Sequence, residues 1–349
     1  MRRIPQLDGI RALAILMVFL HYALNVELMI DIHGLWAGVD IFFVLSGFLI
    51  TGILVDAKSG TPWKYFAHFY ARRARRLLAP YALLLIVASL VFGLGWTHYW
   101  YYYFFLTNVL FAFDIPHPRC FDPLWSLAVE EQFYLVWPVV VYLLTPRRVG
   151  QLSLALIVIA PVLRALAHFS DQLPVYTLAP FRMDLLAAGA LIAIAWRSRR
   201  DLIERWGTLI GGAATIVGSL GLFVLSHFGI GTYTNSALSN VVIFECTLLI
   251  GAGILLFALA GRGVGWMRVK PMVYIGTISY SMYLIHMLIL DLPFVDKLPS
   301  STIPIVAFVL TVLYAALSWS LIESRLLGRP RRIDLDLRPL QPVLSSGAQ

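Results

Sequence analysis

Long apolar runs, separated by short stretches that contain proline, glycine or charged residues, make up most of this chain. The runs are about 17 to 25 residues long, the length that an α-helix needs to cross the hydrocarbon core of a bilayer. The pattern therefore predicts ten membrane-spanning helices. They cover residues 10–29, 36–56, 77–95, 127–145, 151–168, 178–196, 209–228, 236–260, 272–291 and 302–322.

The apolar segment at residues 98–113 breaks the alternation of spans and loops because it is short and rich in aromatic residues. If it crossed the membrane, Arg147 and Arg148 would lie on the opposite side from the other basic loops. Tyrosine and tryptophan are favoured at the membrane interface. We therefore expect a re-entrant or interfacial segment on the outer side, and a short eleventh helix is the alternative.

Composition and charge define the class and the orientation of the protein. Hydrophobic residues make up 60% of the 349 residues, charged residues 13%, and the mean hydropathy is +0.80, which excludes a soluble domain. With a cytoplasmic N-terminus, 22 of the 27 Lys and Arg residues fall in cytoplasmic loops, in agreement with the positive-inside rule. We expect an all-α polytopic helix bundle with both termini in the cytoplasm.

The domain organisation is predicted to be simple. The first span begins with polar residues and lacks a small-residue cleavage site, so we expect it to be retained and not removed as a signal peptide. Residues 1–325 are predicted to form one membrane domain. Residues 326–349 are predicted to be a disordered cytoplasmic tail.

Three ionisable residues lie inside or beside the first two spans. Arg11 and His21 belong to the first span and Asp40 to the second. An ionisable side chain at membrane depth costs several kcal/mol, so such a residue marks a functional site by default. These three residues are therefore the first candidates for the chemistry.

Seven motifs follow one another along the chain: LDGIRALAILMVFLH, GVDIFFVLSGFLIT, FYARRARRLLAPY, LWSLAVEEQFYLVWP, FRMDLLAAGAL, IGTISYSMYLIH and WSLIE. In this order and spacing they resemble a stand-alone member of the acyltransferase-3 family of integral membrane acyltransferases. The resemblance implies transfer of an acyl group, often acetyl, from cytoplasmic acyl-CoA to a hydroxyl of a sugar or glycoconjugate on the far side. Acyl-CoA would be a co-substrate, without a bound cofactor, and the protein would lie in the cytoplasmic membrane of a bacterium.

His21 is the predicted catalytic base. Deprotonation of an acceptor hydroxyl needs a base, and imidazole has the side-chain pKa closest to neutral. His21 lies about eleven residues into the first span, roughly 16 Å along its axis and near the midplane. The family pattern has ten residues between an arginine and the histidine, whereas nine separate Arg11 from His21, and Tyr22 takes the usual position. The alternative is a histidine whose polar atoms a neighbouring helix satisfies.

Arg72, Arg73, Arg75 and Arg76 precede the third span on its cytoplasmic side. The planar guanidinium group binds phosphate oxygens through paired hydrogen bonds, and CoA carries several phosphates. Residues three or four apart share a helix face, so at least part of the cluster can converge on one ligand. We predict that these arginines, with Arg11, bind the CoA donor. A topology signal or a contact with anionic lipids is the alternative.

Glu130 and Glu131 lie about four residues into a helix that descends from the outer face. Adjacent helix residues point about 100° apart, so only one of them needs to face the bundle interior. The resemblance implies a functional glutamate at one of the two positions. We favour Glu130 as the catalytic residue and Glu131 as its structural partner beside the site. A carboxylate that stabilises the helix start is the alternative.

Four further residues are candidates for lining the acceptor site. Arg182 and Asp184 lie near the outer end of the sixth span, where they can instead pair with each other or across helices. Tyr280 and His286 are six residues apart and project to opposite sides of one helix. We therefore expect only one of these two to line a shared cavity.

Other residues are assigned no catalytic role. Ser46 lacks a nucleophile elbow and is interpreted as a small residue that packs between helices. Glu323, beside Arg325, is interpreted as half of a structural ion pair. Cys120 and Cys246 are not expected to form a disulfide. The sequence has no metal-ligand spacing, phosphate-binding loop or dinucleotide fingerprint, and we expect no nucleic-acid partner.

A secondary transporter is the rival interpretation, since it would also place charges at mid-membrane within about ten helices. Transporters are commonly built from paired repeats with broken helices, and the sequence shows neither feature. A membrane glycosyltransferase that uses a lipid-linked sugar is a weaker rival, because the outer loops are too short for an acidic metal-binding domain. The sequence does not indicate the acceptor, the acyl chain length or the oligomeric state.

Overall fold

The structure, a computed structural model, describes residues 4–26, 28, 34–58, 61–93, 97, 100–231, 234–295 and 297–326. These residues form a bundle of α-helices joined by short helical turns, and this part of the chain contains no β-strand. The bundle confirms the predicted all-α class. Of the predicted tail at residues 326–349, all but Leu326 lies outside the described residues.

Each predicted span overlaps a helix of the bundle, with different bounds. The helices are α1 (Pro5–Leu20), α2 (Gly38–Ala57), α3 (Pro62–Phe92), α5 (Leu124–Leu143), α6 (Pro146–Leu166), α8 (Met183–Ser198), α9 (Arg200–His227), α10 (Ala237–Ala260), α11 (Lys270–Leu290) and α12 (Ile303–Ser318). Within the described residues, eight helices are long and apolar enough to cross a membrane. The two predicted spans outside that group are α5, which carries two glutamates, and α8, which has 16 residues.

Shorter elements connect and extend these helices. They are η1 (His21–Val26), η2 (Leu35–Ala37), η3 (Trp100–Tyr102), α4 (Thr107–Ala112), η4 (Arg119–Phe121), α7 (Leu173–Thr177), η5 (Ala179–Phe181), η6 (Gly265–Arg268), η7 (Trp319–Glu323) and α13 (Ser324–Leu326). Two of them, η1 and η7, are π-helical. Such wider turns are rare in proteins and frequently occur at functional sites.

The third helix differs most from its predicted span. α3 begins at Pro62 and runs for 31 residues, whereas hydropathy placed its start at residue 77. Proline fits the first turn of a helix because its missing N–H would be unpaired there in any case. The four arginines thus lie within α3 and not before it, so one continuous helix fixes their positions relative to the membrane span.

The first helix changes its geometry at His21. α1 ends at Leu20, and the chain continues into the π-helical turn η1, which begins at His21. This is the residue at which the spacing from Arg11 departs from the family pattern by one position. Residues 27 and 29, at the end of the predicted first span, lie outside the described residues.

The aromatic segment does not form an additional span. Its described part, residues 100–113, contains η3 and the six-residue helix α4, which is far too short to cross a bilayer. Residues 98 and 99 lie outside the described residues. The side chain of Tyr102 is buried against Phe121, with ring centroids 4.8 Å apart, while Trp100 and Phe104 are exposed. This arrangement supports an interfacial or re-entrant segment.

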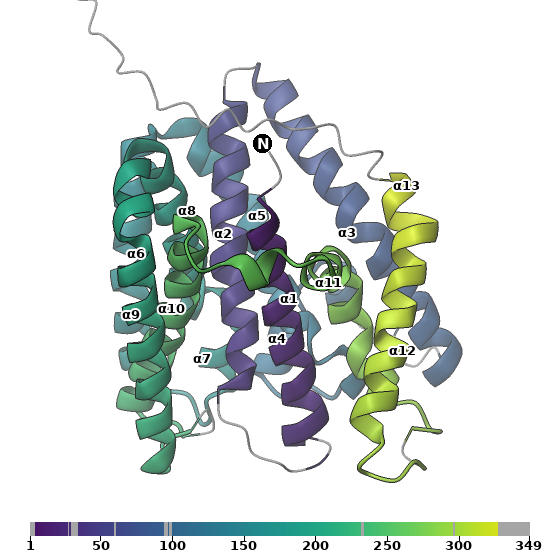
Figure 1. The fold of residues 1–349 in the computed structure, drawn as a ribbon. Helices are drawn as coiled ribbons and strands as arrows, with labels where there is room; N and C mark the ends of the chain where they lie inside the picture. Colours follow the sequence, from purple (N-terminus) through teal and green to yellow (C-terminus); the bar gives the residue numbers. More distant parts are fainter. Residues whose placement is uncertain are drawn as a thin grey trace, which may run out of the picture.

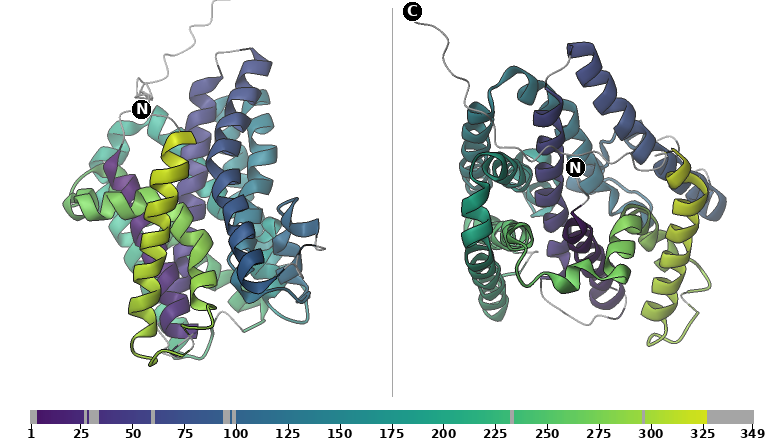
Figure 2. Two further views of the ribbon diagram at one scale, coloured as in Figure 1. Left: turned by 90° about the vertical axis from the view of Figure 1, so that its right-hand side faces the viewer. Right: turned by 45° about the horizontal axis from the view of Figure 1, so that its top comes forward.

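Figure 1 shows α2 in the middle of the bundle, where it packs against α1, α5, α8 and α10. α9 covers the far side of α10, and α12 packs on α11. The two views in Figure 2 show α3 on the outside of the bundle. α3 begins at the top of Figure 1, and the start of α1 and α13 lie below it in the upper half of the view. We call this end, which carries the arginine cluster, the basic end.

Two glycines set the crossing of α2 and α8. A Cβ atom on Gly47 would overlap the backbone oxygen of Leu186, and one on Gly189 would overlap the backbone oxygen of Val44. The two backbones therefore meet directly, as small residues allow between membrane helices. This contact fixes the rotation of α2 and turns Ser46, the neighbour of Gly47, toward α5.

Candidate functional site

A central cavity of about 740 Å³ opens between α1, α2, α3, α5 and α11. Its volume lies within the range of small-molecule sites. Its polar lining residues are Arg11, Ser46, His68, Arg72, Arg73, Arg75, Arg76, Ser126, Glu130, Tyr134, Ser279, Tyr280 and Tyr283. Apolar residues of α2, among them Val39, Phe42 and Leu49, line the opposite wall.

All four arginines of the predicted donor site line this cavity. Among the described residues, none of the four has a carboxylate within ion-pair distance, whereas Arg11 is paired with Asp8 at 2.8 Å. Glu130 is the acidic residue among those that line the cavity. The cavity therefore has a large excess of positive charge at the basic end, which favours an anionic ligand.

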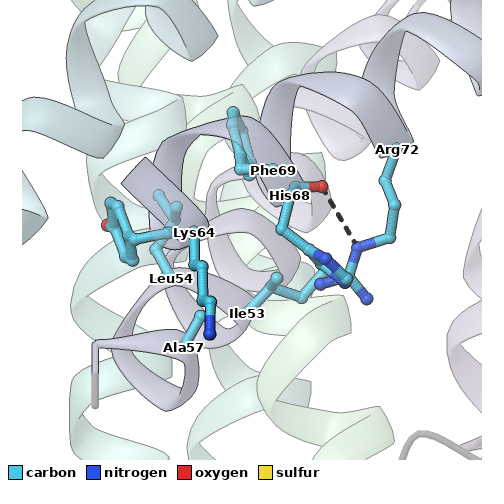
Figure 3. Close-up of a pocket in the computed structure, with 8 residues that line it drawn as sticks. Ile53, Leu54, Ala57, Lys64, His68, Phe69 and Arg72 are labelled. Atoms are coloured by element: carbon cyan, nitrogen blue, oxygen red, sulfur yellow. Dashed lines mark hydrogen bonds between the residues drawn. The ribbon is translucent and has the colours of Figure 1, made fainter. Parts of the chain in front are cut away.

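A side pocket of about 210 Å³ adjoins the central cavity (Figure 3). Lys64, His68 and Arg72 of α3 face Ile53, Leu54 and Ala57 of α2 across it. The side pocket and the central cavity adjoin each other, because His68, Phe69 and Arg72 line both. A ligand can thus place phosphates among the arginines and a flat group between the side chains of this pocket.

Glu130 is held in a chain of polar contacts along α5. The hydroxyl of Tyr134 donates a hydrogen bond to Glu130 Oε2 at 2.6 Å and is also in contact with the hydroxyl of Ser46. The guanidinium of Arg73 lies 4.1 Å above the ring of Tyr134. Glu131 does not line the cavity, and its buried Oε1 has no hydrogen-bond partner among the described residues. This geometry favours Glu130 over Glu131 as the residue that faces a ligand.

Ser126 and Tyr283 meet near the start of α5, with their hydroxyl oxygens 2.6 Å apart. Both residues line the cavity, and Ser126, Glu130 and Tyr134 follow at four-residue spacing along one face of α5. We call Ser126 and Tyr283 the hydroxyl pair. α5 begins at the end of the bundle opposite the arginines, so the hydroxyl pair lies at the end of the cavity farthest from them. We call this end of the cavity the inner end.

His21 lies beyond this inner end. The rings of His21 and Tyr22 are 5.2 Å apart, those of Tyr22 and His286 are 5.2 Å apart, and those of His286 and Tyr283 are 5.6 Å apart. Neither histidine lines the cavity, whereas Tyr280 does, as expected from the spacing of Tyr280 and His286. A row of aromatic rings therefore links the cavity to the predicted base.

Asp40, Arg182 and Asp184, three predicted site residues, do not line the cavity. Arg182, the residue before α8, pairs with Asp40 of α2. Arg164 of α6 lies 2.7 Å from both Asp184 and Glu245. The side chains of Asp40, Arg164, Arg182 and Asp184 are fully buried. The network ties α2, α6, α8 and α10 together, in line with the alternative of pairing across helices.

Breaking this network should destabilise the bundle. We expect Arg182→Met to lower the free energy of unfolding by about 3 to 5 kcal/mol, because Asp40 would be left as an uncompensated buried charge. Arg200→Gln is the control, since Arg200 and Glu204 form an exposed pair on one helix, which contributes about 1 kcal/mol or less. Thermal unfolding in detergent measures both. Equal effects of the two substitutions would show that the Arg182 pair has no special structural role.

The structure extends one sequence interpretation and corrects another. Ser46 is buried beside Gly47 and contacts the hydroxyl of Tyr134 on α5, and it also lines the cavity. Glu323 forms no ion pair within the described residues; its carboxylate accepts hydrogen bonds from Ser281 at 2.6 Å and Ser318 at 3.1 Å. Hydroxyl groups on apolar helices carry no charge, so the charge pattern of the sequence does not reveal these contacts.

Cys120 and Cys246 are both buried and free. Cys120 lies in η4, outside the membrane spans, where burial raises the pKa of its thiol to about 12. A thiol with so high a pKa stays protonated at neutral pH and is a poor nucleophile. Neither cysteine lines the central cavity.

The chain matches the acyltransferase domain family Acyl_transf_3 over residues 4–323. It is 30% identical to the putative peptidoglycan O-acetyltransferase YrhL of Bacillus subtilis, over 93% of this chain and 55% of that protein. It is 27% identical to the peptidoglycan O-acetyltransferase OatA of Listeria monocytogenes, over 92% of this chain and 55% of that protein.

A third relative, the O-acetyltransferase OatA of Staphylococcus aureus, is 28% identical over 93% of this chain and 57% of its own length. The chain thus spans a little over half the length of these curated relatives. No solved structure matches it.

Proposed function

Because this chain belongs to the acyltransferase-3 family, we propose that it moves an acetyl group from cytoplasmic acetyl-CoA to a hydroxyl of an extracytoplasmic carbohydrate. The observation that carries the proposal is the central cavity. It combines four arginines at the basic end, which have no acidic partner in the part of the chain that the structure describes, with Glu130 and the hydroxyl pair farther in. The family match favours this activity over the secondary transporter that the mid-membrane charges alone left open.

The donor would enter from the basic end, in keeping with the positive-inside orientation. Arg72, Arg73, Arg75 and Arg76 would bind its phosphates, and the side pocket with Lys64 would accommodate the adenosine part. The pantetheine arm would then extend along the α5 face that carries Tyr134, Glu130 and Ser126. Hydroxyl and carboxylate groups on that face can hydrogen-bond the two amides of the arm.

The acceptor is proposed to be a cell-wall carbohydrate, because two of the relatives carry names that specify peptidoglycan O-acetylation. The acceptor would approach from the outer side and meet His21, which directly follows the last residue of α1. His21 would take the proton of the acceptor hydroxyl as it attacks the thioester. Glu130, one helical turn from the hydroxyl pair, would orient the reacting groups from the cavity side.

Purified protein in lipid nanodiscs, supplied with acetyl-CoA and soluble peptidoglycan fragments, tests this function. We expect free CoA to appear and acetyl esters to form on the fragments, with slower CoA release when the acceptor is omitted. A transporter would neither hydrolyse acetyl-CoA nor exchange its acetyl group. Absence of both CoA release and acetyl ester under conditions where the protein stays folded would overturn the proposal.

A further inference from the structure

We propose that Ser126 and Tyr283 form an oxyanion site, in which their hydroxyl groups bind the carbonyl oxygen of the acyl thioester during transfer. This inference rests on the proposed function, because it assigns the place at which the reacting carbon of the donor is held. It adds Ser126 and Tyr283 to the proposed site. Both are uncharged, and neither was selected from the sequence.

The two hydroxyls of the pair hydrogen-bond each other, and both also lie within hydrogen-bond distance of the carbonyl oxygen of Pro123. The carbonyl oxygen of Pro123 is approached by three donors: the hydroxyl of Tyr283 at 2.9 Å, the hydroxyl of Ser126 at 3.2 Å and the backbone N–H of Ser126 at 3.3 Å. A carbonyl oxygen has two lone pairs. The hydroxyl whose hydrogen lies between Ser126 and Tyr283 can therefore turn that hydrogen toward a new acceptor, while Pro123 keeps the other hydroxyl and the backbone N–H of Ser126 as partners.

The cavity provides the space for that new acceptor. Ser126 and Tyr283 both line it at the inner end, and their oxygens are only 2.6 Å apart. Tyr283 comes from α11 and Ser126 from α5, so two separate helices hold the two hydroxyl groups. A carbonyl oxygen placed against the pair would receive one hydrogen bond in the ground state, and a developing oxyanion would attract both hydroxyl hydrogens.

The helix that carries Ser126 adds a favourable field. Ser126 is the third residue of α5, which has 20 residues. The N-terminus of a helix carries a partial positive charge that favours nearby anions. This partial charge stabilises the neutral thioester carbonyl less than it stabilises an oxyanion. The hydroxyl pair and the helix start together therefore stabilise the transition state more than the bound donor, which is the requirement for catalysis.

The surroundings of the hydroxyl pair suit the transfer step. Glu130 lies one turn farther along α5, and the ring of Tyr283 contacts that of His286 on the other side. The acceptor oxygen would form a bond to the thioester carbon while its proton passes to the base, and the carbonyl oxygen would become an oxyanion on Ser126 and Tyr283. The C–S bond would then break, the carbonyl would re-form, and the CoA thiolate would take up the proton.

Tyr283→Phe is the direct test, because it removes one hydroxyl and keeps the ring. We expect kcat for acetyl-CoA consumption to fall on the order of 10²-fold, with KM for acetyl-CoA and inhibition by free CoA nearly unchanged. Free CoA has no acyl carbonyl, so its binding should not depend on the hydroxyl pair. Ser126→Ala should lower kcat in the same way. Tyr81→Phe is the matched control, since the buried hydroxyl of Tyr81 donates to Tyr102 O at 2.8 Å and lines no part of the cavity.

The outcomes separate the two proposals. A wild-type protein that consumes acetyl-CoA, with Tyr283→Phe and Ser126→Ala both retaining kcat, would overturn the oxyanion site alone. A rise in KM or weaker inhibition by CoA at constant kcat would also overturn it, because that pattern means ground-state binding. A folded wild-type protein without activity would overturn the proposed function and this inference with it. If one variant fails to fold, the other decides.

Discussion

Replacement of His21 by alanine is expected to lower acetyl transfer by a factor on the order of 10² to 10⁴, the usual contribution of a general base. The side chain lies at the start of a π-helical turn and is only partly buried, so the variant should still fold and insert. The measurement is acetyl-ester formation from acetyl-CoA by purified protein in nanodiscs, compared with the wild type at equal protein concentration.

His168→Ala controls for the loss of an imidazole, because His168 is exposed and lies in the loop after α6. Its activity should match the wild type. If His21→Ala keeps more than about a tenth of the activity, the assignment of His21 as base fails, since the loss would fall below the usual range. His286→Ala and Tyr22→Phe would then identify which member of the ring row acts instead.

Replacing Arg72, Arg73, Arg75 and Arg76 together by glutamine should weaken acetyl-CoA binding by about 10³-fold or more. Hydrogen bonds to charged groups contribute about 1.5 to 3 kcal/mol each, and about 1.4 kcal/mol corresponds to a factor of ten. The dissociation constant of acetyl-CoA, measured by titration in nanodiscs at two salt concentrations, tests this. The dependence of the wild-type affinity on salt should also disappear in the variant.

Arg147→Gln and Arg148→Gln form the matched control, because both arginines are exposed at the basic end and neither lines the cavity. They should leave the acetyl-CoA affinity unchanged. Unaltered affinity of the quadruple variant, together with inverted or failed insertion, would show that the α3 arginines serve only as a topology signal. Arg72→Gln and Arg76→Gln, each made singly, would measure how much each arginine contributes to acetyl-CoA affinity.

Most of the spans were predictable because length and hydropathy together mark the segments that can cross a bilayer. The start of α3 was not, since residues 62–76 are too polar to register as a span although they are helical. The sequence also does not predict short turns such as η1. A π-turn depends on the local packing of α1 and leaves no periodic signal in the sequence.

The site was predictable where charge marked it and not where hydroxyl groups did. The arginines were found because guanidinium groups bind phosphate, and Glu130 was found because the family resemblance implies a glutamate at that position. Asp40 was selected because an ionisable residue is costly in a membrane. Asp40, Arg182 and Asp184 nevertheless pair across helices, and only the tertiary structure reveals such partners. One signal was available and overlooked: the four-residue spacing of Ser126, Glu130 and Tyr134, which places three polar groups on one face of an apolar helix.

We propose that the acetyl group crosses the membrane while CoA stays at the basic end. Sealed proteoliposomes with a single known protein orientation measure this: acetyl-CoA is supplied only on the side of Arg72, and peptidoglycan fragments only on the opposite side. We expect acetyl esters on the fragments and free CoA on the Arg72 side. Product that forms only when both substrates share the Arg72 side would rule out transfer across the membrane.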